Sequence, residues 1–73
     1  MSKYTTSDGL LDYGFDHALG YFYTKYAEKD DVESVIEEGS STFGTSRGVI
    51  LRKIKKSGAP REHQMAIVLD RPF

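Results

Sequence analysis

Asp16 and His17 are adjacent, and a carboxylate beside an imidazole is a pair of side chains that could act as acid and base near neutral pH. Both fall in a stretch that alternates large and small residues, which is typical of a strand. Neighbouring strand residues point to opposite faces, so the two groups cannot work as a close couple. We therefore expect His17 to be a partly buried side chain that bonds a carbonyl or a tyrosine hydroxyl, and we expect no catalytic residue.

Metal, nucleophile and phosphate sites require residues that this chain lacks or does not group. It has no cysteine, and its two histidines, His17 and His63, do not have the spacing of a zinc pair. No serine lies in a G-x-S-x-G elbow, and no glycine-rich phosphate loop follows a strand. Residues 39–48 combine glycines and hydroxyls before a helix start, which can hold an anion, but a flexible connection explains them more simply. The sequence thus predicts no metal, no cofactor and no enzyme.

A run of basic residues is the feature most typical of nucleic-acid binding. Its members are Arg47, Arg52, Lys53, Lys55 and Lys56. On a helix they would present positive charge to phosphates. The net charge of the whole chain is −1, however, and the solvated face of an amphipathic helix accounts for the same residues.

Acidic residues gather in the first part of the chain. Residues 1–45 hold nine acidic and three basic side chains, whereas residues 46–73 hold seven basic and two acidic ones. This asymmetry indicates either an interaction surface or two elements whose charges satisfy each other in the fold. An exposed aromatic pair beside the acids would be a protein-binding hot spot. The candidate partner-binding residues are Phe22, Tyr26, Asp30, Asp31, Glu33, Glu37 and Glu38.

Four segments of the first half carry the signals of strands and their connections. The polar residues 1–9 indicate a flexible N-terminal tail. Alternation predicts a curved strand over residues 13–23, with one aromatic face and one face of mostly small residues. Residues 28–31 have turn character, and residues 32–38 predict a second, antiparallel strand at an edge of the sheet, where charges discourage aggregation.

The second half predicts a loop, a helix and a strand. Residues 39–44 form a loop by composition, from which Phe43 is expected to enter the core. Over residues 46–57 the capping hydroxyls, the apolar spacing and the Gly58 stop favour a helix, although β-branched residues leave a strand open. Residues 64–69 are a near-continuous apolar run, which predicts a strand buried on both faces.

These elements together predict an α+β fold, a small ββαβ domain over residues 10–73. It would hold a three-stranded antiparallel sheet with one helix packed on one face, covering the aromatic side. A chain of this length has a small core, so either a monomer or a homodimer that buries an apolar sheet face is compatible with it.

The expected compartment is the cytoplasm. No apolar run approaches the roughly 20 residues of a membrane span, and the first eight residues lack the apolar stretch of a signal peptide. Small exported domains usually depend on disulfides, which a chain without cysteine cannot form.

The stretch from Tyr13 to Phe22, YGFDHALGYF, and the ending LDRPF resemble small bacterial and prophage proteins that open with a Y-G-[FW]-D-like strand and end near L-D-x-P. Small size, acidic patches and the lack of cysteine are also similar to phage-encoded inhibitors such as anti-CRISPR proteins. The resemblance implies inhibition of a host nuclease complex by occupation of its surface, and it transfers no functional residue.

The leading hypothesis from the sequence is therefore a non-enzymatic protein-binding module. Its acidic segment would meet a basic partner surface, and Phe22 or Tyr26 would anchor the contact. The alternative hypothesis is a small nucleic-acid-binding domain that uses the basic helix face over residues 47–56.

Overall fold

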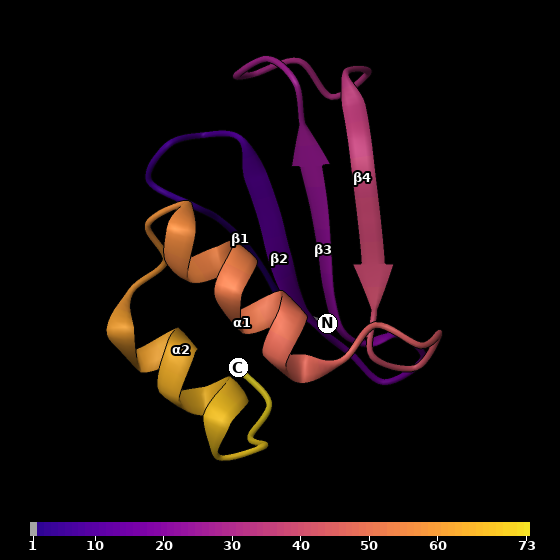
Figure 1. Ribbon diagram of the computed structural model, residues 1–73, viewed down its shortest axis with the longest axis vertical. Coiled ribbons are helices and arrows are strands. Elements are labelled where there is room, and N and C mark those ends of the chain that lie inside the picture. Colours follow the sequence, from indigo (N-terminus) through magenta and orange to yellow (C-terminus); the bar gives the residue numbers. More distant parts are fainter. Residues whose placement is uncertain (1) are drawn as a thin grey trace.

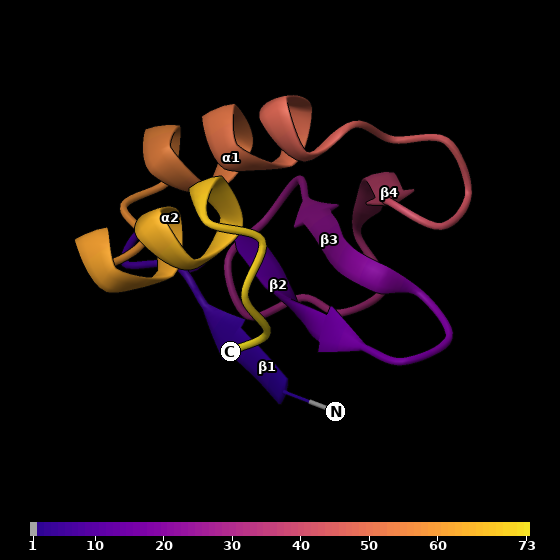
Figure 2. The same cartoon turned by 90° about the horizontal axis from the view of Figure 1, so that it is seen from below.

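The computed structural model describes residues 2–73, which form a four-stranded antiparallel sheet in the order β1-β2-β3-β4 and two helices. Both helices lie on the same side of the sheet (Figures 1 and 2). The predicted α+β class is confirmed, but the predicted three strands and one helix are wrong. The elements are β1 (Ser2–Thr5), β2 (Leu11–Asp16), β3 (Gly20–Tyr26), β4 (Val35–Ser40), α1 (Arg47–Lys56) and α2 (Arg61–Val68).

The single strand predicted over residues 13–23 is instead the hairpin of β2 and β3. Asp16 closes the turn because its Oδ1 accepts hydrogen bonds from the backbone N–H groups of Ala18 (2.7 Å) and Leu19 (3.4 Å). Gly20 then adopts a φ of 68°, which favours glycine. The alternation of large and small residues continues unchanged across this turn, so periodicity alone did not reveal it.

Strand β1 occupies the segment that was predicted to be a flexible tail. It pairs antiparallel with β2, with Tyr4 opposite Tyr13 and Thr5 opposite Asp12. The Thr5 hydroxyl donates to the Asp12 carboxylate at 2.7 Å, which ties the two strands together through side chains. Its polar composition suits an edge strand, since most of its side chains are exposed.

Strand β4 begins three residues later than predicted, and Phe43 lies outside the core. A register shift between Lys25 and Tyr26 marks a β-bulge in the β3–β4 pairing. Val32 belongs to the preceding turn region, where it is exposed. The Phe43 side chain is 76% exposed, which contradicts its predicted place in the core.

Helix α1 confirms the helical prediction for residues 46–57. The Ser46 hydroxyl caps it by accepting a hydrogen bond from the backbone N–H of Val49 at 3.3 Å. Ile50 and Ile54 are buried on its inner face, one helical turn apart. Gly58 follows the helix with a φ of 93°, a conformation that suits the glycine stop signal.

Helix α2 replaces the buried strand that was predicted over residues 64–69. Ile67 is buried, whereas Met65, Val68 and Leu69 are exposed, so the apolar run does not lie between two layers. A short apolar run cannot distinguish a strand from a helix by periodicity, and here the helix packs along α1. Relative to the prediction, the sheet therefore loses the C-terminal strand and gains two strands, β1 and the second strand of the hairpin over residues 13–23.

The core lies between the helices and one face of the sheet. As predicted, the odd-numbered aromatic residues of β2 and β3 face the helical layer, with Tyr13 opposite Tyr23 and Phe15 opposite Tyr21. Phe15, Leu51 and Phe73 pack against the buried cluster. The buried apolar residues are Leu11, Tyr13, Tyr21, Tyr23, Ile50, Ile54, Ala59 and Ile67.

Alanine substitutions at two glycines should have opposite effects. A Cβ at Gly14 would overlap the Ser2 carbonyl oxygen and lie 2.9 Å from Cζ of Phe22, so Gly14→Ala should lower the free energy of unfolding by about 1–3 kcal/mol. Gly48 is helical and has space around it, so Gly48→Ala should raise this free energy by about 0.5–1 kcal/mol. Chemical denaturation of the two variants measures both changes, and a Gly14→Ala variant as stable as the parent would contradict the close β1–β2 packing.

Candidate functional site: the open face of the sheet and the β4 edge

The side of the sheet opposite the helices is termed here the open face, and no helix of residues 2–73 covers it (Figure 2). Phe22 and Thr24 of β3 point to this face, and Glu38 lies opposite Thr24 on β4. The Phe22 ring lies over Gly14, which leaves room for it by lacking a side chain. Tyr26 shares the face, since its hydroxyl bonds Asp12 of β2. The predicted aromatic pair of Phe22 and Tyr26 is therefore on one surface.

Asp12 is the polar centre of the open face and was missed by the sequence analysis. Its carboxylate accepts hydrogen bonds from Thr5 (2.7 Å) and Tyr26 (2.8 Å) and lies 3.5 Å from Nζ of Lys3. Burial acts to raise the pKa of Asp12, but the two hydroxyl donors and the Lys3 charge outweigh it and lower this pKa. The carboxylate thus fixes the position of the Tyr26 hydroxyl on the open face.

Asp12→Asn should reduce stability in a pH-dependent way. The lowered folded-state pKa means that the ionised carboxylate stabilises the fold fully above its ordinary value of 3.8, and that this contribution is lost as pH falls through the lowered pKa. We expect the variant to lose about 1–3 kcal/mol of unfolding free energy at neutral pH and to approach the parent in acid. Asp8 and Glu37 also have lowered pKa values, but both residues are present in the parent and in the Asp12→Asn variant, so their contributions cancel in the difference. Urea denaturation of both proteins across acidic pH measures the difference, and a difference independent of pH would contradict the account.

Exposed carboxylates border the open face. Asp30 and Asp31 line a recess of about 150 Å³ together with Asp12, Tyr26 and neighbouring residues. Glu33 and Glu38 are also exposed, the former in the turn and the latter on β4. We term Asp30, Asp31 and Glu38 the acidic rim.

Glu37 does not belong to the acidic rim, which corrects its inclusion among the candidate residues. It lies opposite Lys25 on the helical side of the sheet, where it forms an ion pair with Lys53 and accepts a hydrogen bond from the Tyr23 hydroxyl at 2.6 Å. The hydrogen bond from Lys53 and then that from Tyr23 lower the pKa of Glu37. This carboxylate therefore joins β3, β4 and α1.

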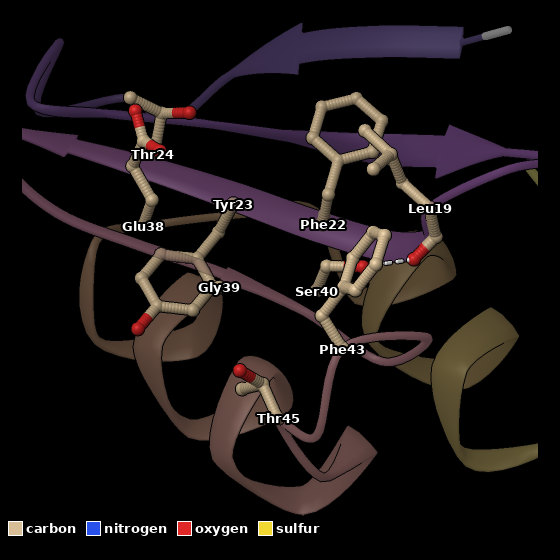
Figure 3. Close-up of a pocket in the computed structure, with 9 residues that line it drawn as sticks. All are labelled: Leu19, Phe22, Tyr23, Thr24, Glu38, Gly39, Ser40, Phe43 and Thr45. Carbon is tan, nitrogen blue, oxygen red and sulfur yellow. Dashed lines mark hydrogen bonds between the residues drawn. The ribbon is translucent and has the colours of Figure 1, made fainter.

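A recess of about 370 Å³ follows the outer side of β4 (Figure 3). Phe22, Thr24 and Glu38 point to one side of the strand, and Tyr23 and Thr45 lie on the other. The loop after β4 closes one end, where the Ser40 hydroxyl donates to the Leu19 carbonyl. The recess is lined by Leu19, Phe22, Tyr23, Thr24, Glu38, Gly39, Ser40, Phe43 and Thr45.

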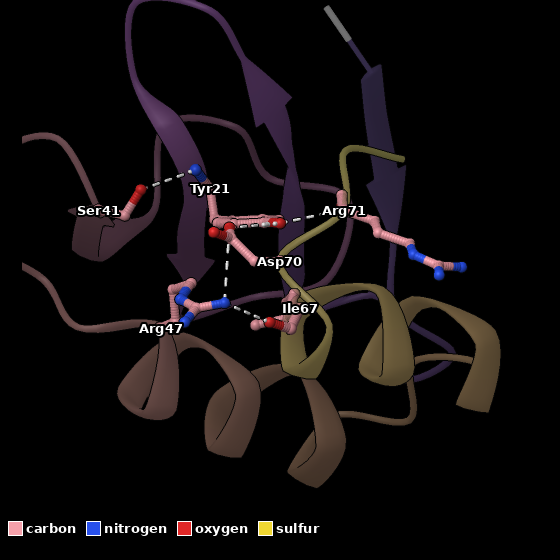
Figure 4. A network of polar contacts seen from close by, with 6 residues as sticks. All are labelled: Tyr21, Ser41, Arg47, Ile67, Asp70 and Arg71. Carbon is pink, nitrogen blue, oxygen red and sulfur yellow. Dashed lines mark hydrogen bonds and ion pairs between the residues drawn. The ribbon is translucent and has the colours of Figure 1, made fainter.

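Two of the five candidate nucleic-acid-binding residues are engaged within the fold. Arg47 donates to the Ile67 carbonyl at 3.0 Å and lies 3.5 Å from the Asp70 carboxylate, which also accepts from the Tyr21 hydroxyl (Figure 4). Lys53 pairs with Glu37. In the described part of the chain, only the Lys53–Glu37 pair joins a base of the second part of the chain to an acid of the first part, because Arg47 and Asp70 both belong to the second part. The exposed basic residues of α1 that make no ion pair within residues 2–73 are Arg52, Lys55 and Lys56.

The two histidines have different surroundings, and neither pairs with a carboxylate as an acid–base couple among residues 2–73. His17 is exposed in the β2–β3 turn beside Phe15, which contradicts its predicted partial burial. His63 of α2 is partly buried, and its Nδ1 lies at hydrogen-bond distance from the Tyr13 hydroxyl. Burial raises the pKa of Tyr13 to about 12, so this hydroxyl stays protonated beside His63. The ring of Phe73 stacks on His63 at 5.1 Å, which makes this cluster part of the packing.

Comparisons and composition add no further site. Among residues 2–73, no three side chains of the metal-binding types come together, and no helix of this part of the chain has the length and apolar character to cross a bilayer. The sequence matches no protein-family model, and neither the curated proteins nor the solved structures compared with it give a match. The open face, the acidic rim and the recess beside β4 are therefore the basis for a functional proposal.

Proposed function

We propose that this protein is a non-enzymatic protein-binding module whose open face covers a basic surface of its partner. Support comes above all from one observation: the side of the sheet without helices carries Phe22 and Tyr26 inside a border of exposed carboxylates. Aromatic side chains dominate binding energy when they fill pockets, and surrounding charges set the rate and specificity of association. A partner rich in lysine and arginine fits this surface.

The biological role proposed for such a module is inhibition by occlusion. A small domain that covers the basic surface of a host nucleic-acid-targeting complex would compete with the phosphates that this surface binds. The cytoplasm is the proposed site of action, and a phage or mobile element is the proposed source. The acidic rim would take the place of the phosphates, while Phe22 would supply contact area that nucleic acid lacks.

The alternative function is nucleic-acid binding through α1. It is favoured by the exposed residues Arg52, Lys55 and Lys56, two of which line a shallow recess of about 240 Å³ with Val49 and Lys53. It is weakened because Arg47 and Lys53 make ion pairs within the fold. Binding through these bases would weaken steeply with rising salt, because each phosphate contact releases counterions.

Affinity capture from host extract tests the proposal. Tagged parent protein should retain a stoichiometric protein partner after nuclease treatment, identified by mass spectrometry. Phe22→Ala should lose that partner, whereas the matched variant Leu69→Ala, which changes an exposed residue after α2, should keep it. Recovery only through nucleic acid, or equal capture by both variants, would overturn the proposal.

A further inference from the structure

We propose that the partner contributes an extended segment that pairs with the outer edge of β4 as a fifth strand of the sheet. This inference rests on the proposed protein-binding function and specifies how the partner is held. In strand addition, main-chain hydrogen bonds supply affinity and side-chain positions on alternate faces supply specificity. Three observations support this inference: β4 has outward-pointing backbone N–H and C=O groups, a recess lies beside this strand, and acidic side chains lie along it.

The backbone of β4 directs polar groups away from the sheet. β4 is the last strand in the order, and the N–H of Ser41 points inward because it donates to the Tyr21 carbonyl at 2.8 Å. Residues alternate in an antiparallel ladder, so the N–H and C=O of Glu38 point outward. The Ser40 carbonyl also points outward, and it accepts hydrogen bonds from the N–H groups of Phe43 and Thr45. The loop after β4 thus provides donors for the outward carbonyl of Ser40, whereas the outward N–H and C=O of Glu38 remain accessible to an added strand.

The recess in Figure 3 has the form that an added strand requires. It extends to both sides of β4, with Glu38 and Phe22 on the open face and Tyr23 and Thr45 on the other. Gly39 has no side chain to block the second side, and the Tyr23 ring occupies the space that a Cβ there would need. The recess therefore carries the Glu38 carboxylate and the Phe22 ring toward the open face and the Tyr23 ring toward the helices.

The charge along β4 identifies the chemistry of the occupant. Lysine or arginine side chains on one face of the added strand would meet Glu38 and the acidic rim, and their methylene stems would cover Val35 and Ile36, which is 61% exposed. Small apolar side chains on the other face would lie against Tyr23 and Gly39. A second copy of this chain is disfavoured because its own β4 would place Glu37 and Glu38 against like charges. The occupant is thus an extended segment that alternates basic and small apolar residues.

A peptide of about seven residues that alternates lysine and valine is the probe for this inference. We expect this peptide to bind with a dissociation constant of about 1 mM or lower, measured by NMR titration. Bound peptide should also slow hydrogen exchange at the backbone amide of Glu38, measured by NMR. We expect the added strand to run antiparallel to β4, so that the lysine opposite Glu38 exchanges N–H and C=O hydrogen bonds with it, and backbone N-methylation at the lysines should weaken binding by about tenfold or more. N-methylation at the valines, whose N–H groups point away from β4, should be tolerated, and a glutamate–valine peptide should not bind.

Two variants of one residue isolate the backbone contact. Glu38→Ala and Glu38→Pro both remove the carboxylate, but only the proline removes the outward N–H, and proline is accepted in edge strands at such positions. The proline variant should bind the probe at least about threefold more weakly than the alanine variant, while circular dichroism shows both folded. Equal binding by the two variants, or no binding of the probe to the parent protein, overturns strand addition.

Failure of this inference is distinguishable from failure of the proposed function. If Phe22→Ala abolishes capture of the protein partner while Glu38→Pro and Glu38→Ala bind that partner equally, the module binds proteins through side chains of the open face alone. If Phe22→Ala, Glu38→Ala and Glu38→Pro all leave capture of the partner unchanged, both the proposed function and the strand addition are wrong.

Discussion

Ile54→Ala is expected to lower the free energy of unfolding by about 2–5 kcal/mol, the cost of removing large aliphatic groups from a packed core. Ile54 is 0% exposed and lies on the inner face of α1, among the residues that join the helix to the sheet. A domain of this size has a total stability of the order of 5 kcal/mol. We therefore expect a large fraction of the variant to be unfolded at physiological temperature, as measured by chemical and thermal denaturation.

Val68→Ala is the matched control for this prediction. Val68 is also an aliphatic residue of a helix, but its side chain is 54% exposed on α2. Its truncation should change the free energy of unfolding by no more than about 0.5 kcal/mol. Similar losses in the two variants would contradict the location of the core between α1 and the sheet.

Phe22→Ala is expected to weaken partner binding by at least about 30-fold, or about 2 kcal/mol, the range of a central aromatic anchor. Phe22 lies on the open face above Gly14, away from the buried cluster. The effect should therefore appear in the dissociation rate of the complex, while the far-ultraviolet circular dichroism of the free protein stays the same. Surface plasmon resonance with the captured partner measures it.

Leu69→Ala separates this anchor effect from a general loss of surface apolarity. Leu69 is exposed at the end of α2, on the helical side of the molecule, and its substitution should leave affinity within about threefold of the parent. If Leu69→Ala weakens binding as strongly as Phe22→Ala, the contact surface is not the open face.

Part of the fold could be predicted because its signals are local. The Ser46 cap, the apolar spacing and the Gly58 stop identify α1 without knowledge of its neighbours. The hairpin turn at Asp16 is different, because alternation passes through it without a break. Helix α2 and strand β1 depend on packing and pairing with a neighbouring element, which their own residues do not encode: α2 packs on α1, and β1 pairs with β2 through contacts such as Thr5 to Asp12.

The candidate site could be predicted from the sequence where the alternation of side chains along a strand determines the face on which a residue lies. Phe22 and Tyr26 are an even number of residues apart on one strand, so they share a face, and the structure places both there. The same alternation places the neighbours Glu37 and Glu38 on opposite faces of the sheet, although the prediction assigned both to one binding surface. Asp12 was missed because its partners, Thr5 and Tyr26, come from two other strands, and no local pattern records a contact between three strands.

The central claim is that an acidic, aromatic sheet face binds a basic protein surface, and two charge-reversed variants test it most directly. One carries Asp30→Lys, Asp31→Lys and Glu38→Lys on the acidic rim, and the other carries Arg52→Glu, Lys55→Glu and Lys56→Glu on α1. Titration calorimetry with the captured partner should show a loss of about 100-fold or more for the first variant and a change within about threefold for the second. Unchanged affinity in the first variant together with a large loss in the second would contradict the claim and assign binding to the basic helix.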